Sequence, residues 1–143
     1  MHAADPRHQR LIAVLAPLLA RTCPQDGGGY GDAYELRLTA EEVEDLGGLA
    51  LLRSALRAAA RTLGWSRLET YGVDTAGGTV AGVVDRRQVP DESADAVDRH
   101  RQARMRAAVE MVARNTADGV RRAVPGSGTL TAQEFRAALA DRG

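Results

Sequence analysis

Three arginines, Arg53, Arg57 and Arg61, stand four residues apart in the segment RSALRAAARTLGW. On a helix this spacing places their guanidinium groups along one side, where like charges repel one another. No acidic residue lies three or four positions from any of them. The row therefore predicts one of three things: a surface for anions, a contact with acids from elsewhere in the chain, or a solvated helix face without a partner.

A row of guanidinium groups suits the phosphate oxygens of a nucleic acid, because each contact releases counterions. Aromatic residues make up only 3% of the chain, so we expect contact with a duplex backbone rather than stacking on single-stranded bases. Three further arginines border a predicted hairpin and would extend the row. The predicted contact surface, for nucleic acid or for an acidic protein, comprises Arg53, Arg57, Arg61, Arg67, Arg86 and Arg87.

The charge balance of the chain argues against a general polyanion binder. Its 143 residues include 19 basic and 19 acidic ones, giving a formal net charge of zero, whereas proteins that bind nucleic acid over a large surface carry a basic excess. Any such contact must therefore be a local patch. Every basic residue is arginine and alanine is abundant, which is typical of GC-rich coding in bacteria more than of selection for guanidinium groups.

Residues that commonly carry catalysis or bind metals are scattered along the chain. The three histidines are His2, His8 and His100. None is at metal-ligand spacing from another histidine or from Cys23, and no Gly-x-Ser-x-Gly segment marks a nucleophile. Glu69, Asp74 and Asp85 could gather a metal ion as in a nuclease, but the lysine that commonly completes such a site is absent. We therefore expect no catalytic residue, no metal and no cofactor.

Two glycine-bearing loops, at residues 26–32 and 74–78, would let a ligand approach the backbone closely. The first has three consecutive glycines but lacks the lysine of a phosphate-binding P-loop, and a strand pattern follows it. These loops are the site of an alternative function, that of a small enzyme or a ligand-binding protein.

The apolar run LIAVLAPLLA belongs to a helix predicted over residues 6–21, which Asp5 would cap and Pro6 would begin. Its ten residues are too few to cross a membrane. A secretory signal is the alternative, but the acidic residue in the flank and the lack of an A-x-A site disfavour it. Because the one cysteine, Cys23, needs no oxidising compartment, we expect a cytoplasmic protein without membrane contact.

Alternating apolar and polar residues predict a strand over residues 34–38. A Thr-x-x-Glu capping box then starts a helix over residues 40–63, which Gly47 and Gly48 should loosen or break. The runs SRLETYGVD and TVAGVVDRR, joined by TAGG, predict a hairpin. These segments indicate a β-α-β-β core with a small three-stranded sheet.

A long helix is predicted over residues 93–115, with an apolar side made of Ala94, Val97, Met105, Ala108 and Val112. Arg101 falls in the middle of that side. Its side chain could extend out of the core along its long stem, pair with an acid of the sheet, or mark the place where the helix docks on a partner. After a loop, Thr131 and Glu134 form a second capping box that predicts a short final helix.

Together these elements predict an α+β fold in a single domain of residues 1–143. A mostly antiparallel three-stranded sheet is covered by the helices at 40–63 and 93–115, the core spans 33–115, and a loop and short helix occupy 116–143. The expected function is that of a small non-enzymatic binding or regulatory protein, for instance a DNA-binding one. A third possibility is an oligomeric assembly protein, in which the alanine-rich back of helix 6–21 and the stripe around Arg101 pack between subunits.

Overall fold

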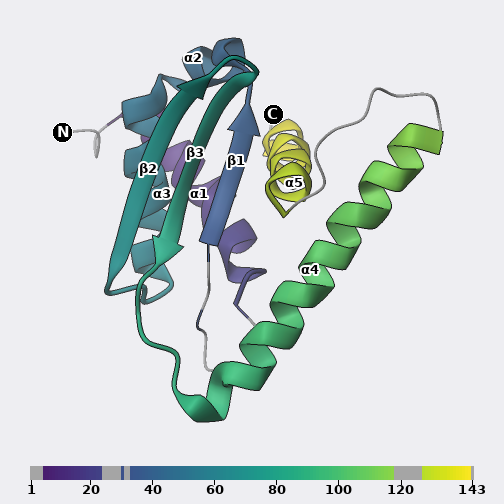
Figure 1. Ribbon diagram of the computed structural model, residues 1–143. Coiled ribbons are helices and arrows are strands. Elements are labelled where there is room, and N and C mark those ends of the chain that lie inside the picture. The colour runs from purple at the N-terminus through teal and green to yellow at the C-terminus, as the bar shows by residue number, and fades with distance from the viewer. Residues whose placement is uncertain (1–4, 24–29, 31–32, 118–126, 143) are drawn as a thin grey trace.

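The computed structural model describes residues 5–23, 30, 33–117 and 127–142, and their path is drawn in Figure 1. Within this part of the chain, helices and an antiparallel sheet confirm the predicted α+β fold and its β-α-β-β core. The elements in order are α1 (Pro6–Ala20), β1 (Ala33–Leu38), α2 (Ala40–Leu46), α3 (Leu49–Thr62), β2 (Leu68–Thr75), β3 (Gly78–Asp85), α4 (Asp91–Ala117) and α5 (Ser127–Arg142).

The sheet has the strand order β1-β3-β2, so the second strand of the hairpin lies in the centre. Leu36 is opposite Ala81 on one side of β3, and Tyr71 is opposite Gly82 on the other. In β1 the buried residues Tyr34 and Leu36 alternate with exposed or half-buried ones. One face of the sheet is therefore directed into the core, as the alternation predicts, and the other is directed outwards.

Local signals set the boundaries of the elements around this sheet. The side chain of Thr39 accepts a hydrogen bond from the Glu42 backbone amide, and the Glu42 carboxylate accepts one from the Thr39 amide, which confirms the first capping box. The predicted helix 40–63 is broken into α2 and α3 at Gly47 and Gly48, whose φ angles of 114° and 103° favour glycine. Asp5 caps α1 by accepting from the backbone amide of Arg7.

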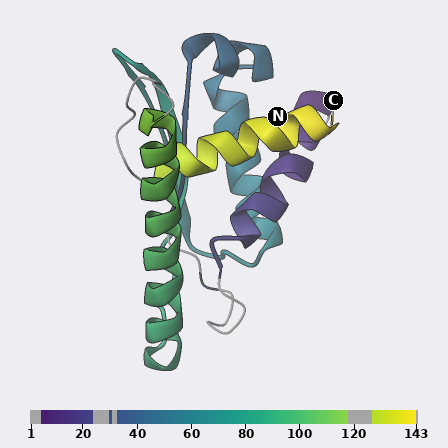
Figure 2. The ribbon, with the colours of Figure 1, turned by 90° about the vertical axis from the view of Figure 1, so that its right-hand side faces the viewer.

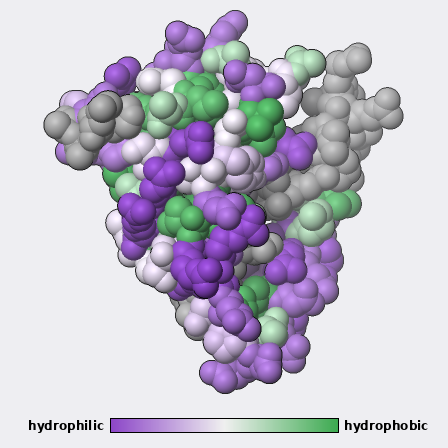
Figure 3. All heavy atoms as spheres, turned by 60° about the vertical axis from the view of Figure 1, so that its left-hand side comes forward, coloured by the Kyte–Doolittle hydropathy of each residue, from purple (hydrophilic) through white to green (hydrophobic). Residues whose placement is uncertain are grey.

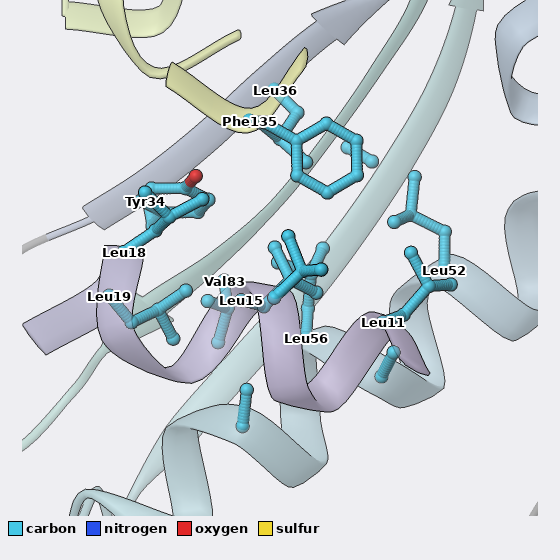
Figure 4. Close-up of a cluster of buried hydrophobic side chains, with 14 of the residues drawn as sticks. Leu11, Leu15, Leu18, Leu19, Tyr34, Leu36, Leu52, Leu56, Val83 and Phe135 are labelled. Carbon is cyan, nitrogen blue, oxygen red and sulfur yellow. The ribbon is translucent and has the colours of Figure 1, made fainter. Parts of the chain in front are cut away.

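The hydrophobic core lies between the inner face of the sheet and the helices α1, α3 and α5. Figure 4 shows leucines of α1 and α3 converging with residues of β1, β3 and α5. Fully buried residues at the centre include Leu15, Leu19, Tyr34, Leu36, Leu52, Leu56, Val83 and Phe135. Burying a side chain of this size contributes about 1.5–3 kcal/mol, so this cluster is the main source of stability for the α1, α3 and sheet layers.

The position of the long helix differs from the prediction. In Figure 2, α1 and α3 lie on one side of the sheet, while α4 stands beyond the β1 edge and meets the first turns of α5. The expectation that this helix covers the sheet is therefore wrong. Its tie to the rest of the molecule is polar: Arg104 binds Glu134 of α5 at 2.7 and 3.2 Å. Because this contact is made by charged residues, no apolar pattern in the sequence indicates that α4 docks on α5.

The apolar side predicted for this helix is also only partly buried. Val97 and Ala108 are buried, but Ala94 is exposed and 44% of Met105 is accessible to solvent. The side chain of Val112 lies outside the described part. Because the helix contacts α5 rather than the sheet, its buried face is rotated about the helix axis relative to the predicted apolar face.

The final helix is longer than predicted. α5 begins at Ser127, so Thr131 lies inside the helix and does not cap it, and the second capping box is wrong. Thr131 instead donates its hydroxyl hydrogen to the carbonyl oxygen of Glu35 at the β1 edge. Both residues of the expected box are thus used in tertiary contacts, while Phe135 packs in the core as expected.

Candidate anion-binding face

The predicted arginine row lies on α3, which runs antiparallel to β2. At one end, a Cβ atom on Gly72 of β2 would lie 2.8 Å from Leu49 Cδ1 of α3, so the two elements are in close contact there. Further along α3, Arg53 reaches Thr70 of β2. The helix therefore carries its arginines towards the start of β2, where Arg67 stands.

Two arginines of the row meet at one threonine. Arg53 Nη2 donates to the carbonyl oxygen of Thr70 at 3.2 Å and to its Oγ1 at 3.3 Å. Arg57 Nη2 donates to the same Oγ1 at 3.0 Å. The carbonyl belongs to an edge strand of the sheet, so Arg53 also blocks part of an edge to which another strand could add.

This arrangement brings two positively charged guanidinium groups together without a carboxylate between them. Both Nη2 atoms bind one oxygen, at 3.3 and 3.0 Å, so they lie within about 6 Å of each other, where like charges repel by about 1 kcal/mol in water and about 3 kcal/mol at an effective dielectric constant of 20. Among the residues that the structure describes, no carboxylate forms an ion pair with Arg53 or Arg57. Glu35 binds Arg37 and Tyr71 instead, and neither Asp91 nor Glu92 forms an ion pair with the two arginines.

The two guanidinium groups retain unused donors. Together they have ten N–H groups, and the three hydrogen bonds to Thr70 occupy at most three of these. The Nε atom of Arg53 is buried and forms no hydrogen bond. An oxyanion at this position would satisfy donors that are otherwise directed at neutral groups or water.

Arg61 and Arg67 are exposed, and within the described ranges neither takes part in an ion pair. Arg61 follows Arg57 by one helical turn, so the three helix positions span about 12 Å. Hereafter we call Arg53, Arg57, Arg61 and Arg67 the arginine face. Figure 3 shows the side of the molecule on which α3 and β2 lie, where hydrophilic residues predominate and hydrophobic ones are scattered.

Arg86 and Arg87, the other two predicted contact residues, already bind acids of the same chain. Arg86 Nη2 lies 3.3 Å from Glu69 Oε2 in an exposed pair. Arg87 Nη2 lies 2.7 Å from Asp85 Oδ2, and the carboxylate is almost completely buried. Arg87 also donates to the carbonyl of Gly64 at the end of α3, and its hydrogen bonds to the Asp85 carboxylate raise the pKa of its guanidinium. The structure therefore separates these two residues from the four uncompensated ones.

The acids considered for a metal ion are not brought together. Glu69 and Asp85 bind arginines, and Asp74 accepts a hydrogen bond from Thr79 Oγ1 at 2.9 Å. In the part of the chain that the structure covers, no three histidine, cysteine, aspartate or glutamate side chains form a group that could hold a metal ion.

The two glycine-bearing loops do not form one site. Of the loop 26–32, all residues except Tyr30 lie outside the described part, and Tyr30 is close to the start of β1, with its ring 4.7 Å from Arg87 Cζ. The turn at 74–78 is at the other end of the sheet, about 17 Å away along β1. A groove of about 520 Å³ adjoins this turn, between it and α2, but the one acid of the turn that borders it, Asp74, is bound to Thr79.

Arg101, predicted to mark a docking surface, lies on α4, where it lines a small cavity together with Ala33 of β1. Its Nη1 atom is 3.8 Å from Asp98 Oδ1, and about half of each side chain is exposed. Its side chain is therefore exposed rather than in the core.

Thr70 was not among the residues predicted for the site. The alternation in β2 places Thr70 on the same face as Leu68, but only the offset between α3 and β2 decides which arginines reach it. That offset depends on contacts such as the one between Leu49 and Gly72, which no local pattern indicates.

Comparisons with family models, with characterised proteins and with solved structures find no protein similar to this chain. No helix in the described ranges is both long enough and apolar enough to cross a membrane.

Proposed function

We propose that this protein is a small non-enzymatic binding protein that contacts the phosphate backbone of a nucleic acid duplex through the arginine face. The observation that carries the proposal is the convergence of Arg53 and Arg57 on Thr70 with no carboxylate among their described partners. Guanidinium groups bind phosphate oxygens in a two-pronged geometry, and a phosphate would remove the repulsion between the two arginines.

Duplex backbone fits this surface better than single strands do. The row on α3 extends about 12 Å, and a DNA strand carries one phosphate per about 3.4 Å of helix axis, so several phosphates lie within reach. Tyr71 is held on the outer face of the sheet by its hydrogen bond to Glu35, away from the arginines. Contacts of this type position a protein on DNA or RNA without reading its sequence.

Arg86 and Arg87 are not needed for this contact, because their charges are already paired. We place the protein in the cytoplasm, where nucleic acid is available and where a lone cysteine such as Cys23 remains reduced. A regulatory role would follow if the bound protein limits the access of other proteins to the duplex.

Fluorescence anisotropy with a labelled duplex of about 20 base pairs tests the proposal. We expect a dissociation constant on the order of 10 µM at moderate salt, weakened about tenfold in the double variant Arg53→Gln/Arg57→Gln. Arg106→Gln, which removes one exposed arginine from α4, is the control and should change the affinity less than about twofold. Equal duplex affinity of the double variant and the wild type contradicts the proposal. If polyglutamate binds as tightly as the duplex does, the partner is an acidic protein instead.

A further inference from the structure

The outer face of the sheet is not covered by any described helix. In Figure 1 the three strands lie in front of α1 and α3, with nothing described before them. Val73 is 54% exposed, and Val80 opposite it is half-buried, as is Val84, which is opposite Glu69. We call Tyr71, Val73, Val80 and Val84 the uncovered sheet face.

Tyr71 gives this face a flat centre. A Cβ atom on Gly82 would lie 2.5 Å from the Tyr71 ring, so the ring lies directly over Gly82 of the central strand. Its hydroxyl donates to Glu35 Oε1 of β1 at 2.7 Å, which spans all three strands. Burial and this hydrogen bond raise the pKa of Tyr71, so the hydroxyl remains a donor. Charged residues, Glu35 and Glu69 among them, lie at the border, as around an interface core.

A second apolar surface lies on α4. Arg101, Met105 and Val109 follow one another at intervals of four residues, and Met105 and Val109 are 44% and 47% exposed. Arg101 and Met105 line a small cavity of about 60 Å³ together with Ala33 of β1. Since Ala33 is in register with Val84 on the outer side of the sheet, Arg101 and Met105 lie beside the β1 edge of the uncovered sheet face.

We propose that a second copy of this chain occupies the uncovered sheet face, with the α4 of each copy lying along β2 of the other. The spacings match. The outward residues of β2, Glu69, Tyr71 and Val73, repeat about every 6.7 Å, and the row on α4 repeats about every 6.0 Å. Arg101 then meets Glu69, Met105 meets Tyr71, and Val109 meets Val73.

The chemistry of each pairing is favourable. Arg101 and Glu69 have opposite charges, and both side chains are more than half exposed, so their present partners at 3.8 and 3.3 Å are readily exchanged. A methionine sulfur beside a tyrosine ring contributes about 0.3–1.5 kcal/mol. The two valines bury apolar surface that water now covers.

Two-fold symmetry allows both contacts at once. α4 and β2 run in the same direction in Figure 1, so an axis parallel to the strands places the α4 of each copy over β2 of the other without reversing it. The formal net charge of zero adds no overall repulsion between the copies.

Light scattering and sedimentation of the full chain over a range of concentrations test this pairing. We expect the mass of two chains, with a dissociation constant that rises at least about tenfold in Val73→Glu and in Met105→Glu. Both positions are exposed, so these variants should fold. Ala137→Glu, an exposed position on α5, is the control and should leave the dimer intact.

A charge exchange tests the register of the pairing. Arg101→Glu and Glu69→Arg should each weaken the dimer, and the double variant that carries both should restore it to within about threefold of the wild type. A monomer at every concentration, as expected if another protein covers the face, overturns the proposal. A dimer unaffected by Val73→Glu, or no rescue in the double variant, overturns it as well. Val73→Glu and Met105→Glu change neither the arginine face nor the ion pair between Glu69 and Arg86, so these two variants test the dimer separately from the duplex contact.

Discussion

The guanidinium groups of Arg53 and Arg57, one turn apart on α3, donate hydrogen bonds to the same Thr70 hydroxyl, at 3.3 and 3.0 Å. This relationship answers the question that their spacing raises. The repulsion along the row is not relieved by an acid in the described chain, but by a neutral oxygen at the edge of the sheet. Arg53 therefore combines two roles, one in closing the β2 edge and one in presenting positive charge.

The two roles can be separated by stability. Arg53→Gln should lower the free energy of unfolding by about 1 kcal/mol, because two hydrogen bonds to Thr70 are lost. Arg61→Gln should leave stability within about 0.5 kcal/mol, because this side chain is exposed, while still weakening duplex binding. Urea unfolding followed by circular dichroism gives both values. A large loss of stability in Arg61→Gln would show that its charge serves the fold.

The attachment of α4 depends on Glu134, which binds Arg104 at 2.7 Å and lies 3.4 Å from Arg21. Glu134→Gln should lower the free energy of unfolding by about 1–3 kcal/mol, because the part-buried Arg104 and the exposed Arg21 both lose their anion. Hydrogen exchange should become faster in residues 93–110 before it does so in the sheet. Glu110→Gln, which removes an exposed acid from α4, is the control. Unchanged exchange in α4 would mean that apolar contacts alone hold this helix.

Glu42 makes stability depend on acid pH. Hydrogen bonds from Arg136, at 2.7 and 2.9 Å, are the main reason that its pKa falls from 4.5 to about 2. Because the folded pKa is the lower one, the pair stabilises the protein above about pH 4.5, and this contribution is lost as the pH falls towards 2. The pair is partly exposed, so its value is about 1 kcal/mol or less. Urea unfolding at pH 7, 4 and 2.5 should show this loss in the wild type and not in Glu42→Gln, and parallel curves would contradict it.

The outer face of the sheet requires glycine at position 82. A methyl group there would lie 2.5 Å from the Tyr71 ring and 2.8 Å from the carbonyl oxygen of Tyr34, a backbone atom. Gly82→Ala should therefore cost about 1–3 kcal/mol of stability. Gly77→Ala, at a turn position with nothing within 4 Å of the added carbon, is the matched control and should cost much less. Equal melting temperatures of the two variants would contradict this packing.

Local signals predicted much of this fold. The hairpin follows from two strand-like runs around a glycine-bearing turn, and the break between α2 and α3 follows from the consecutive glycines Gly47 and Gly48. The α4 and α5 contacts could not be predicted, because Arg104 and Glu134 are charged residues whose pattern indicates solvent exposure until a partner from another helix is known. Of the predicted site, the row on α3 could be derived from spacing, whereas Thr70 and the ion pairs of Arg86 and Arg87 depend on tertiary structure.

The salt dependence of duplex affinity tests the central claim most directly. If all four residues of the arginine face meet phosphates, the logarithm of the binding constant should fall against the logarithm of salt concentration, between about 50 and 200 mM, with a slope of about −3.6. In Arg53→Gln/Arg57→Gln the slope should be about −1.8. A wild-type affinity that does not change with salt, or one slope for both proteins, would contradict the claim that these arginines bind a polyanion.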